Sequence, residues 1–124
     1  MSDFLTNFVE DLKENVAGFI AVAVTEIKTG MSYKALSVDP SFDAELAAAY
    51  NLEVVKAKMS TIKALNLNEE VEDIMITLTN QIHIISVSTS GEYFIYLAVD
   101  STKANLGLTR AILKKYSREI ESKL

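Results

Sequence analysis

Cysteine is absent from the 124-residue sequence, and histidine and proline occur once each. Without cysteine, the chain forms neither a disulfide framework nor a thiolate metal site. The single histidine, His83, leaves no second imidazole to share a metal ion. The four glycines do not form either of the usual phosphate-binding loops, G-x-x-x-x-G-K-[ST] or G-x-G-x-x-G. We therefore expect neither a cofactor nor a metal.

Long hydrophobic runs are absent as well. The stretch A-G-F-I-A-V-A-V at 17–24 is far shorter than the ~20 residues of a membrane-spanning helix. The first residues, M-S-D-F-L-T-N-F-V-E, carry acids where a signal peptide would carry positive charge. Twelve basic against seventeen acidic side chains give a net charge of −5, which disfavours nucleic acid as a partner. We expect a cytoplasmic protein that neither spans a membrane nor binds nucleic acid.

Apolar side chains are abundant and make up 49% of the sequence. A chain of this length and composition can bury a core, and it shows no repeat, linker or low-complexity tract. We therefore expect a single domain over 1–124, with an N-terminal helix at 1–16 and the core at 17–124. The helix is predicted from apolar residues at helical spacing, namely Leu5, Phe8, Val9, Leu12 and Val16.

Five apolar runs have the pattern of β-strands. The run at 18–26 is apolar on both alternations, which predicts a strand covered on both faces. The run at 31–38 alternates polar and apolar residues, as an edge strand does. The runs at 71–79, 81–88 and 92–100 follow one another through short polar loops, which predicts antiparallel hairpins.

Two further helices are predicted, at 39–65 with Pro40 in the first turn and at 100–124. The order is then α-β-β-α-β-β-β-α. Because the strand at 18–26 is apolar on both sides, helices must cover both faces of the sheet. The predicted fold class is α+β, with a mostly antiparallel five-stranded sheet and helices on both of its faces.

The helix at 39–65 carries two apolar stripes. They comprise Ala48, Leu52, Val55, Met59 and Ile62 in one row, and Tyr50, Val54, Ala57, Thr61 and Leu65 in the neighbouring row. One stripe is enough to cover a sheet. The second stripe indicates either a broad face buried within the single chain or a contact with something else.

The start of the last helix has the strand, glycine and helix order that often binds phosphate. Asp100 or Ser101 is expected to cap it, and Gly107 lies within its first turns. Glycine there costs about 1 kcal/mol against alanine, which close packing of the helix on the sheet would offset. Asn105 could bond to a neighbouring backbone. We interpret this stretch as a capped helix start and not as a phosphate cradle.

Few polar residues suggest catalysis. His83 lies within a strand, where a structural or surface role is favoured over a general base. The stretch at 88–90 is Ser-Thr-Ser without the G-x-S-x-G context of a nucleophile elbow. Carboxylates gather at the start of the run at 71–79, but their spacing is not that of a calcium loop. They are Glu69, Glu70, Glu72 and Asp73.

Several motifs together match a known family. They are G-F-I-A-V-A-V-T-E-I-K-T-G-M at 18–31, A-E-L-A-A-A-Y-N-L-E-V-V-K-A-K-M at 44–59, V-E-D-I-M-I-T-L-T-N-Q-I-H-I-I at 71–85, Y-F-I-Y-L-A-V-D at 93–100 and A-N-L-G-L-T-R-A-I-L at 104–113. From about Val16 to its end, the chain resembles the Roadblock/LC7 family in its bacterial and archaeal branch.

The resemblance implies a dimer whose sheet continues across both subunits, with the two long helices together on one face. It also implies a protein without chemistry of its own. Members act as scaffolds or regulators of small Ras-like GTPases, some stimulating GTP hydrolysis, or as light-chain adaptors of motor complexes. The leading hypothesis is therefore a non-enzymatic, dimeric regulator of a small Ras-like GTPase.

The dimer contact expected from the double stripe and the apolar edge combines the long helix with the strand at 73–78. The interface residues are Leu52, Val55, Met59, Ile62, Ile74, Met75 and Ile76. Of the two arginines, Arg110 is expected to be a structural or surface cation and not a catalytic finger, and Arg118 is the other.

Two alternatives stay open. One is a small-molecule sensor with an apolar pocket near Tyr93, Tyr96 and His83. The other is a light-chain-like adaptor of a motor complex. An enzyme is the least favoured class, because no constellation of catalytic residues is evident.

Overall fold

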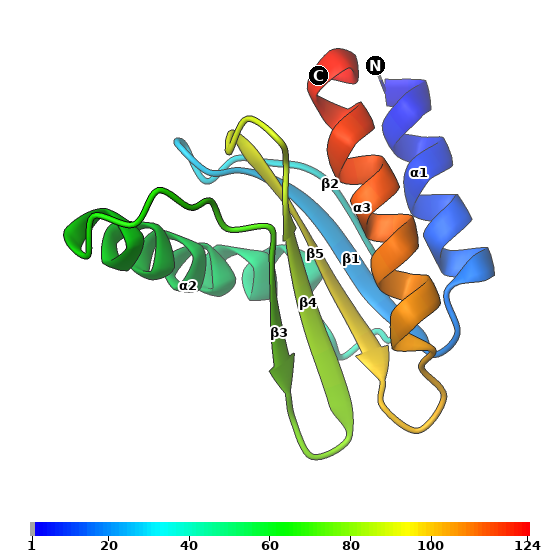
Figure 1. Ribbon diagram of the computed structural model, residues 1–124. Coiled ribbons are helices and arrows are strands. Elements are labelled where there is room, and N and C mark those ends of the chain that lie inside the picture. Colours follow the sequence, from blue (N-terminus) through cyan, green and yellow to red (C-terminus); the bar gives the residue numbers. More distant parts are fainter. Residues whose placement is uncertain (1) are drawn as a thin grey trace.

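A computed structural model describes residues 2–124 as one sheet with three helices (Figure 1). The elements in chain order are α1 (Ser2–Asn15), β1 (Phe19–Glu26), β2 (Ser32–Ser37), α2 (Ala44–Ala64), β3 (Asp73–Thr77), β4 (Gln81–Val87), β5 (Tyr93–Asp100) and α3 (Leu106–Lys123). The predicted order α-β-β-α-β-β-β-α and the α+β class are confirmed.

The sheet has the strand order β2-β1-β5-β4-β3, and all four neighbouring pairs are antiparallel. Short connections join β1 to β2, and β3 to β4 to β5. The chain crosses from one edge of the sheet to the other only once, through α2. The two edges are therefore β2, as predicted from its polar alternation, and β3.

Helices cover both faces of the sheet, with α1 and α3 side by side on one face and α2 on the other (Figure 1). In β1, Val22 and Val24 belong to the core beneath α1 and α3, whereas Ala21 and Ala23 belong to the core beneath α2. This alternation produces the doubly apolar pattern of the strand.

The N-terminal helix is part of the first core. Its predicted apolar residues are all buried, and Phe8 packs edge-on against Tyr116 of α3 with ring centroids 4.6 Å apart. The Tyr116 hydroxyl donates a hydrogen bond to Asp11 of α1. Desolvation and this bond raise the pKa of Tyr116 to about 12.

Among residues 2–124, no helix is long and apolar enough to cross a membrane.

The predicted start of α2 was wrong. Pro40 lies in a turn before the helix, where the Phe42 N–H donates to the Asp39 carbonyl at 3.0 Å. The Asp39 carboxylate accepts from the Ser41 N–H at 2.9 Å, a local bond that competes with helix formation. The helix begins at Ala44, and the Asp43 side chain caps it by accepting from the Leu46 N–H.

The predicted cap of α3 was also wrong. Asp100 ends β5, and its carboxylate accepts from the Thr102 N–H at 2.9 Å and the Thr102 hydroxyl at 2.7 Å. These bonds lower the pKa of Asp100. The cap is Asn105, whose side chain accepts from the Leu108 N–H instead of bonding to a neighbouring element.

Gly107 does not dock α3 on the sheet, contrary to prediction. It is exposed, and the nearest atom to an added Cβ would be Asn105 Oδ1 at 3.9 Å. The glycine that allows a close approach is Gly18, with a φ of +78°. A Cβ on Gly18 would lie 2.9 Å from the carbonyl oxygen of Asp100, so only glycine fits between α1 and β1 at this point.

Candidate interaction surface

The outer edge of β3 is open along its length. The Leu78 N–H donates to the Gln81 carbonyl at 2.8 Å, and the Val87 N–H donates to the Glu72 carbonyl at 2.9 Å. Since antiparallel residues alternate between bonded and non-bonded pairs, the even-numbered residues of β3 direct their backbone groups toward β4. The N–H and C=O groups of Asp73, Met75 and Thr77 therefore point outward, where a further strand could bind them.

Apolar side chains flank this edge on both faces of the sheet. Ile74 and Ile76 are half-buried, and Ile74 packs against the core beneath α2. Met75 lies on the opposite face and is exposed. An open strand edge bordered by apolar side chains is prone to pair with another chain.

Two of the predicted contact residues on α2 lie elsewhere. Leu52 and Val55 are only 7% and 0% exposed, because they face the sheet and form part of the core beneath α2. Neither offers surface to a second chain, so we remove both from the predicted interface. Met59 and Ile62 continue the same stripe past the edge of the core and are half-buried.

The second stripe of α2 lies on the surface. Tyr50 is 72% exposed, Leu65 is 63% exposed and Val54 is 37% exposed. Ala57 and Thr61 of the same stripe are exposed as well. The alternative that the broad face is buried within the single chain is therefore wrong.

A groove of about 680 Å³ joins the helix to the strand. Its apolar lining comes from α2, from the segment that leads into β3 and from β3 itself, and Lys58 and Glu70 also border it. The apolar lining residues are Val54, Ala57, Ile62, Val71 and Ile74. We call the exposed stripe of α2, this groove and the open edge of β3 together the α2–β3 surface.

Cations of α3 hold the start of β3 from the other face of the sheet. Arg110 makes two hydrogen bonds to Asp73, at 2.8 and 3.2 Å, and the hydrogen bond to this carboxylate raises the arginine pKa. Lys114 lies 3.4 Å from Glu72. Two of the four predicted carboxylates are thus paired. Within residues 2–124, no three or more acidic or histidine side chains are arranged to hold a metal ion.

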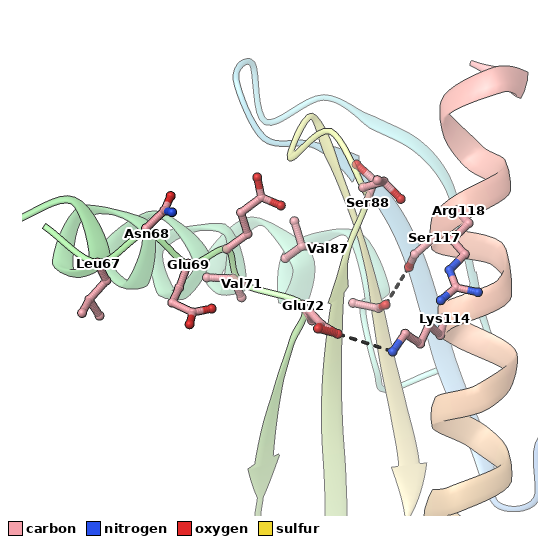
Figure 2. Close-up of a pocket in the computed structure, with 13 residues that line it drawn as sticks. Leu67, Asn68, Glu69, Val71, Glu72, Val87, Ser88, Lys114, Ser117 and Arg118 are labelled. Carbon is pink, nitrogen blue, oxygen red and sulfur yellow. Dashed lines mark hydrogen bonds and ion pairs between the residues drawn. The ribbon is translucent and has the colours of Figure 1, made fainter.

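A second hollow, of about 690 Å³, lies between α3, the end of β4 and the segment at 67–72 (Figure 2). Ser86 of β4 and Ser117 of α3 are both buried there, and their hydroxyl oxygens are 2.6 Å apart. Ser88 and Thr89 also line the hollow. The single histidine, His83, does not line it, so neither hydroxyl belongs to a Ser-His-Asp triad there. Sequence reasoning did not identify this hollow, because its walls come from segments far apart in the chain.

His83 has a structural role among aromatic residues. Its Nε2 lies 2.8 Å from Gln81 Oε1 and its Nδ1 lies 3.0 Å from the Tyr96 hydroxyl. Burial lowers the pKa of His83, which favours the neutral ring. Tyr93 and Tyr96 are buried, and neither they nor His83 line the two hollows. His83 and Tyr96 pack against each other on the α2 side of the sheet, whereas Tyr93 packs against Tyr33 in the core on the other side. The three residues therefore do not line one pocket.

No family model matches the sequence, and no curated protein matches it. Solved structures do match. A Roadblock/LC7 domain from Streptomyces avermitilis has a TM-score of 0.78 at 11% identity and covers 99% of this chain and 96% of that one. MglB from Myxococcus xanthus has a TM-score of 0.75 at 16% identity, covering 95% and 91%. MglC from Myxococcus xanthus has a TM-score of 0.66 at 20% identity, covering 97% and 98%.

Proposed function

We propose that this chain, which has the Roadblock/LC7 fold of its solved neighbours, is a non-enzymatic scaffold. In this proposal it forms a homodimer through the α2–β3 surface and binds a small Ras-like GTPase. The observation that carries this proposal is the open edge of β3 next to an exposed apolar stripe. Soluble monomers rarely leave such a strand edge and such a stripe uncovered side by side.

In the proposed dimer, two copies of β3 pair antiparallel and the sheets of both subunits become continuous. The outward backbone groups of Asp73, Met75 and Thr77 would then find partners, as in other cases of strand addition. Ile62 and Ile74 in the groove, with Met59 nearby, would contact the second copy of α2. Val54, Ala57, Thr61 and Leu65 extend this contact along the helix.

The proposed partner, a small Ras-like GTPase, rests on the family resemblance and on the likeness to MglB. The described residues supply no competing catalytic site, since His83 is bound at both ring nitrogens. Arg110 is engaged by Asp73 and is not poised to enter another protein's active site. Any stimulation of GTP hydrolysis would therefore not come from a donated Arg110.

Affinity capture tests this proposal directly. The purified protein is immobilised and exposed to native lysate with either GDP or a non-hydrolysable GTP analogue, and retained proteins are identified by mass spectrometry. We expect a small GTPase to be retained mainly with the GTP analogue, and the purified GTPase to bind again on its own. Recovery of only this protein under both nucleotides would contradict the GTPase assignment and leave the dimer intact.

A further inference from the structure

Three cations follow one another along one face of α3. Arg110, Lys114 and Arg118 are four residues apart, so their side chains lie one above the other along the helix. Opposite them runs an acidic segment in the reverse direction. Asp73 pairs with Arg110, and Glu72 lies 3.4 Å from Lys114. The first two cations of α3 are thus each paired with successive acidic residues of the opposite segment.

The third position of the row is open. Within residues 2–124, Arg118 makes no hydrogen bond and no ion pair. At this position the hollow of about 690 Å³ separates the segment at 67–72 from α3. Figure 2 shows Lys114 and Arg118 on the α3 wall and Glu69 on the opposite wall. Glu70 also lines the hollow, and both glutamates are exposed.

The hollow also offers a buried hydrogen-bond donor. Ser86 and Ser117 are each 5% exposed, and their hydroxyl oxygens are 2.6 Å apart. Each serine carries one hydroxyl proton, and the bond between them uses only one of the two. The accepting serine therefore keeps a proton that can bind an oxygen atom placed in the hollow next to α3.

We infer that this hollow binds a zwitterionic small molecule of the amino acid or dipeptide class. Its carboxylate would pair with Arg118 and accept from the serine hydroxyl, and its ammonium group would pair with Glu69 or Glu70. A purely anionic ligand would meet the glutamate wall, and a purely cationic one would meet Lys114 and Arg118. A ligand with both charges pairs with Arg118 and with the opposite glutamates at the same time.

The volume of the hollow agrees with this class. Ligand sites for small molecules span roughly 300–1,000 Å³, and a hollow of about 690 Å³ admits a dipeptide with its hydration. The hollow shares Glu70, Val71 and Glu72 with the groove of the α2–β3 surface, whereas Arg118 and the two serines line the hollow alone. The inference rests on these last three residues and not on the proposed dimer or GTPase partner.

Amide chemical shifts of the full-length protein test the inference. The probes are L-alanyl-L-alanine and the free proteinogenic amino acids, with N-acetyl-alanyl-alanine and alanyl-alanine amide as analogues that each lack one charge. We expect saturable shifts at Ser86, Ser117 and Arg118 with at least one zwitterion. Either analogue should bind about tenfold more weakly, since each loses one charge-assisted contact.

Variants of the same protein locate the site. Arg118→Gln and the double variant Glu69→Gln/Glu70→Gln should each weaken binding about tenfold, while Lys123→Gln, on the same helix but outside the hollow, should leave it unchanged. The spectra themselves report whether each variant is folded. The inference is overturned if no zwitterion gives saturable shifts at these residues, or if the single-charge analogues bind equally well. Either result leaves the outcome of GTPase capture unaffected.

Discussion

Arg110 of α3 holds Asp73, the first residue of β3, through two hydrogen bonds, from Nε at 2.8 Å and from Nη2 at 3.2 Å. Asp73 also directs its backbone groups outward from the open edge. The ion pair thus fixes the strand at the point where we propose that a second chain is added. A preorganised edge costs less conformational entropy on binding than a mobile one.

Replacing Arg110 by glutamine should therefore weaken dimerisation without unfolding the chain. We expect the dimer dissociation constant to rise roughly two- to fivefold, the effect of losing a partly exposed ion pair. Sedimentation equilibrium measures the constant. The difference from the wild type should shrink at high salt, because screening weakens the same pair.

Arg118→Gln is the matched control for this change, since it removes the same charge from the same helix without touching β3. Equal weakening by both variants would mean that the net charge of α3, and not the contact with Asp73, sets the affinity.

Gly18→Ala should destabilise the fold by about 2–4 kcal/mol. The residue has a φ of +78°, and the added Cβ would lie 2.9 Å from a backbone carbonyl oxygen of Asp100. Gly91→Ala is the control, because Gly91 has a φ of +79° but no neighbour within 4 Å of its Cβ position. Its cost should be only about 1 kcal/mol. Urea denaturation of both variants measures the difference, and equal losses would contradict the close contact.

Asn105→Ala should lower the free energy of unfolding by about 1 kcal/mol, because the Leu108 N–H loses its acceptor at the start of α3. Asn105→Asp keeps an acceptor at the same place and should retain most of the stability. Chemical denaturation compares the two. If alanine and aspartate had the same effect, capping by Asn105 would not contribute to stability.

His83 should make the stability depend on pH. Burial lowers its pKa in the folded state, so the unfolded chain binds more protons below the ordinary histidine pKa of about 6.5. The stability that the neutral ring contributes is therefore fully present above pH ~6.5. It is lost as the pH falls from there through the lowered pKa of His83 in the folded protein. Urea midpoints at about pH 7.5 and 5.5 should therefore differ more for the wild type than for His83→Gln. The same difference in both proteins would contradict this role.

The sequence was a good guide to the strands and to the layers. The double alternation at 18–26 predicted a strand between two layers of helices, and the periodicity of α1 predicted its buried face. Helix starts were predicted poorly, although Pro40 and Asp100 are residue types common at helix starts. The side chains of Asp39 and Asp100 instead accept hydrogen bonds from Ser41 and Thr102 in turns. Whether a side chain bonds within a turn or caps a helix depends on the local backbone geometry, which residue preferences do not specify.

The interaction surface was predicted in part. The two stripes of α2 were evident, but the sequence did not indicate which one faces the sheet, and Leu52 and Val55 were assigned to the wrong surface. The pair formed by Ser86 and Ser117 joins residues 31 positions apart, so no local pattern could reveal it.

The most direct test of the proposed dimer is the mass of the protein in solution, measured by light scattering for the wild type and two proline variants. Met75→Pro removes an outward N–H from β3 without breaking a bond to β4. Ala35→Pro removes an outward N–H from β2 in the same way, because the Val38 N–H donates to the Ile20 carbonyl and sets the alternation there.

We predict that the wild type and Ala35→Pro have twice the 13.7 kDa mass of one chain, and that Met75→Pro is a folded monomer. A monomeric wild type over about a hundredfold range of concentration would contradict the account. So would a folded Met75→Pro variant that keeps the mass of a dimer.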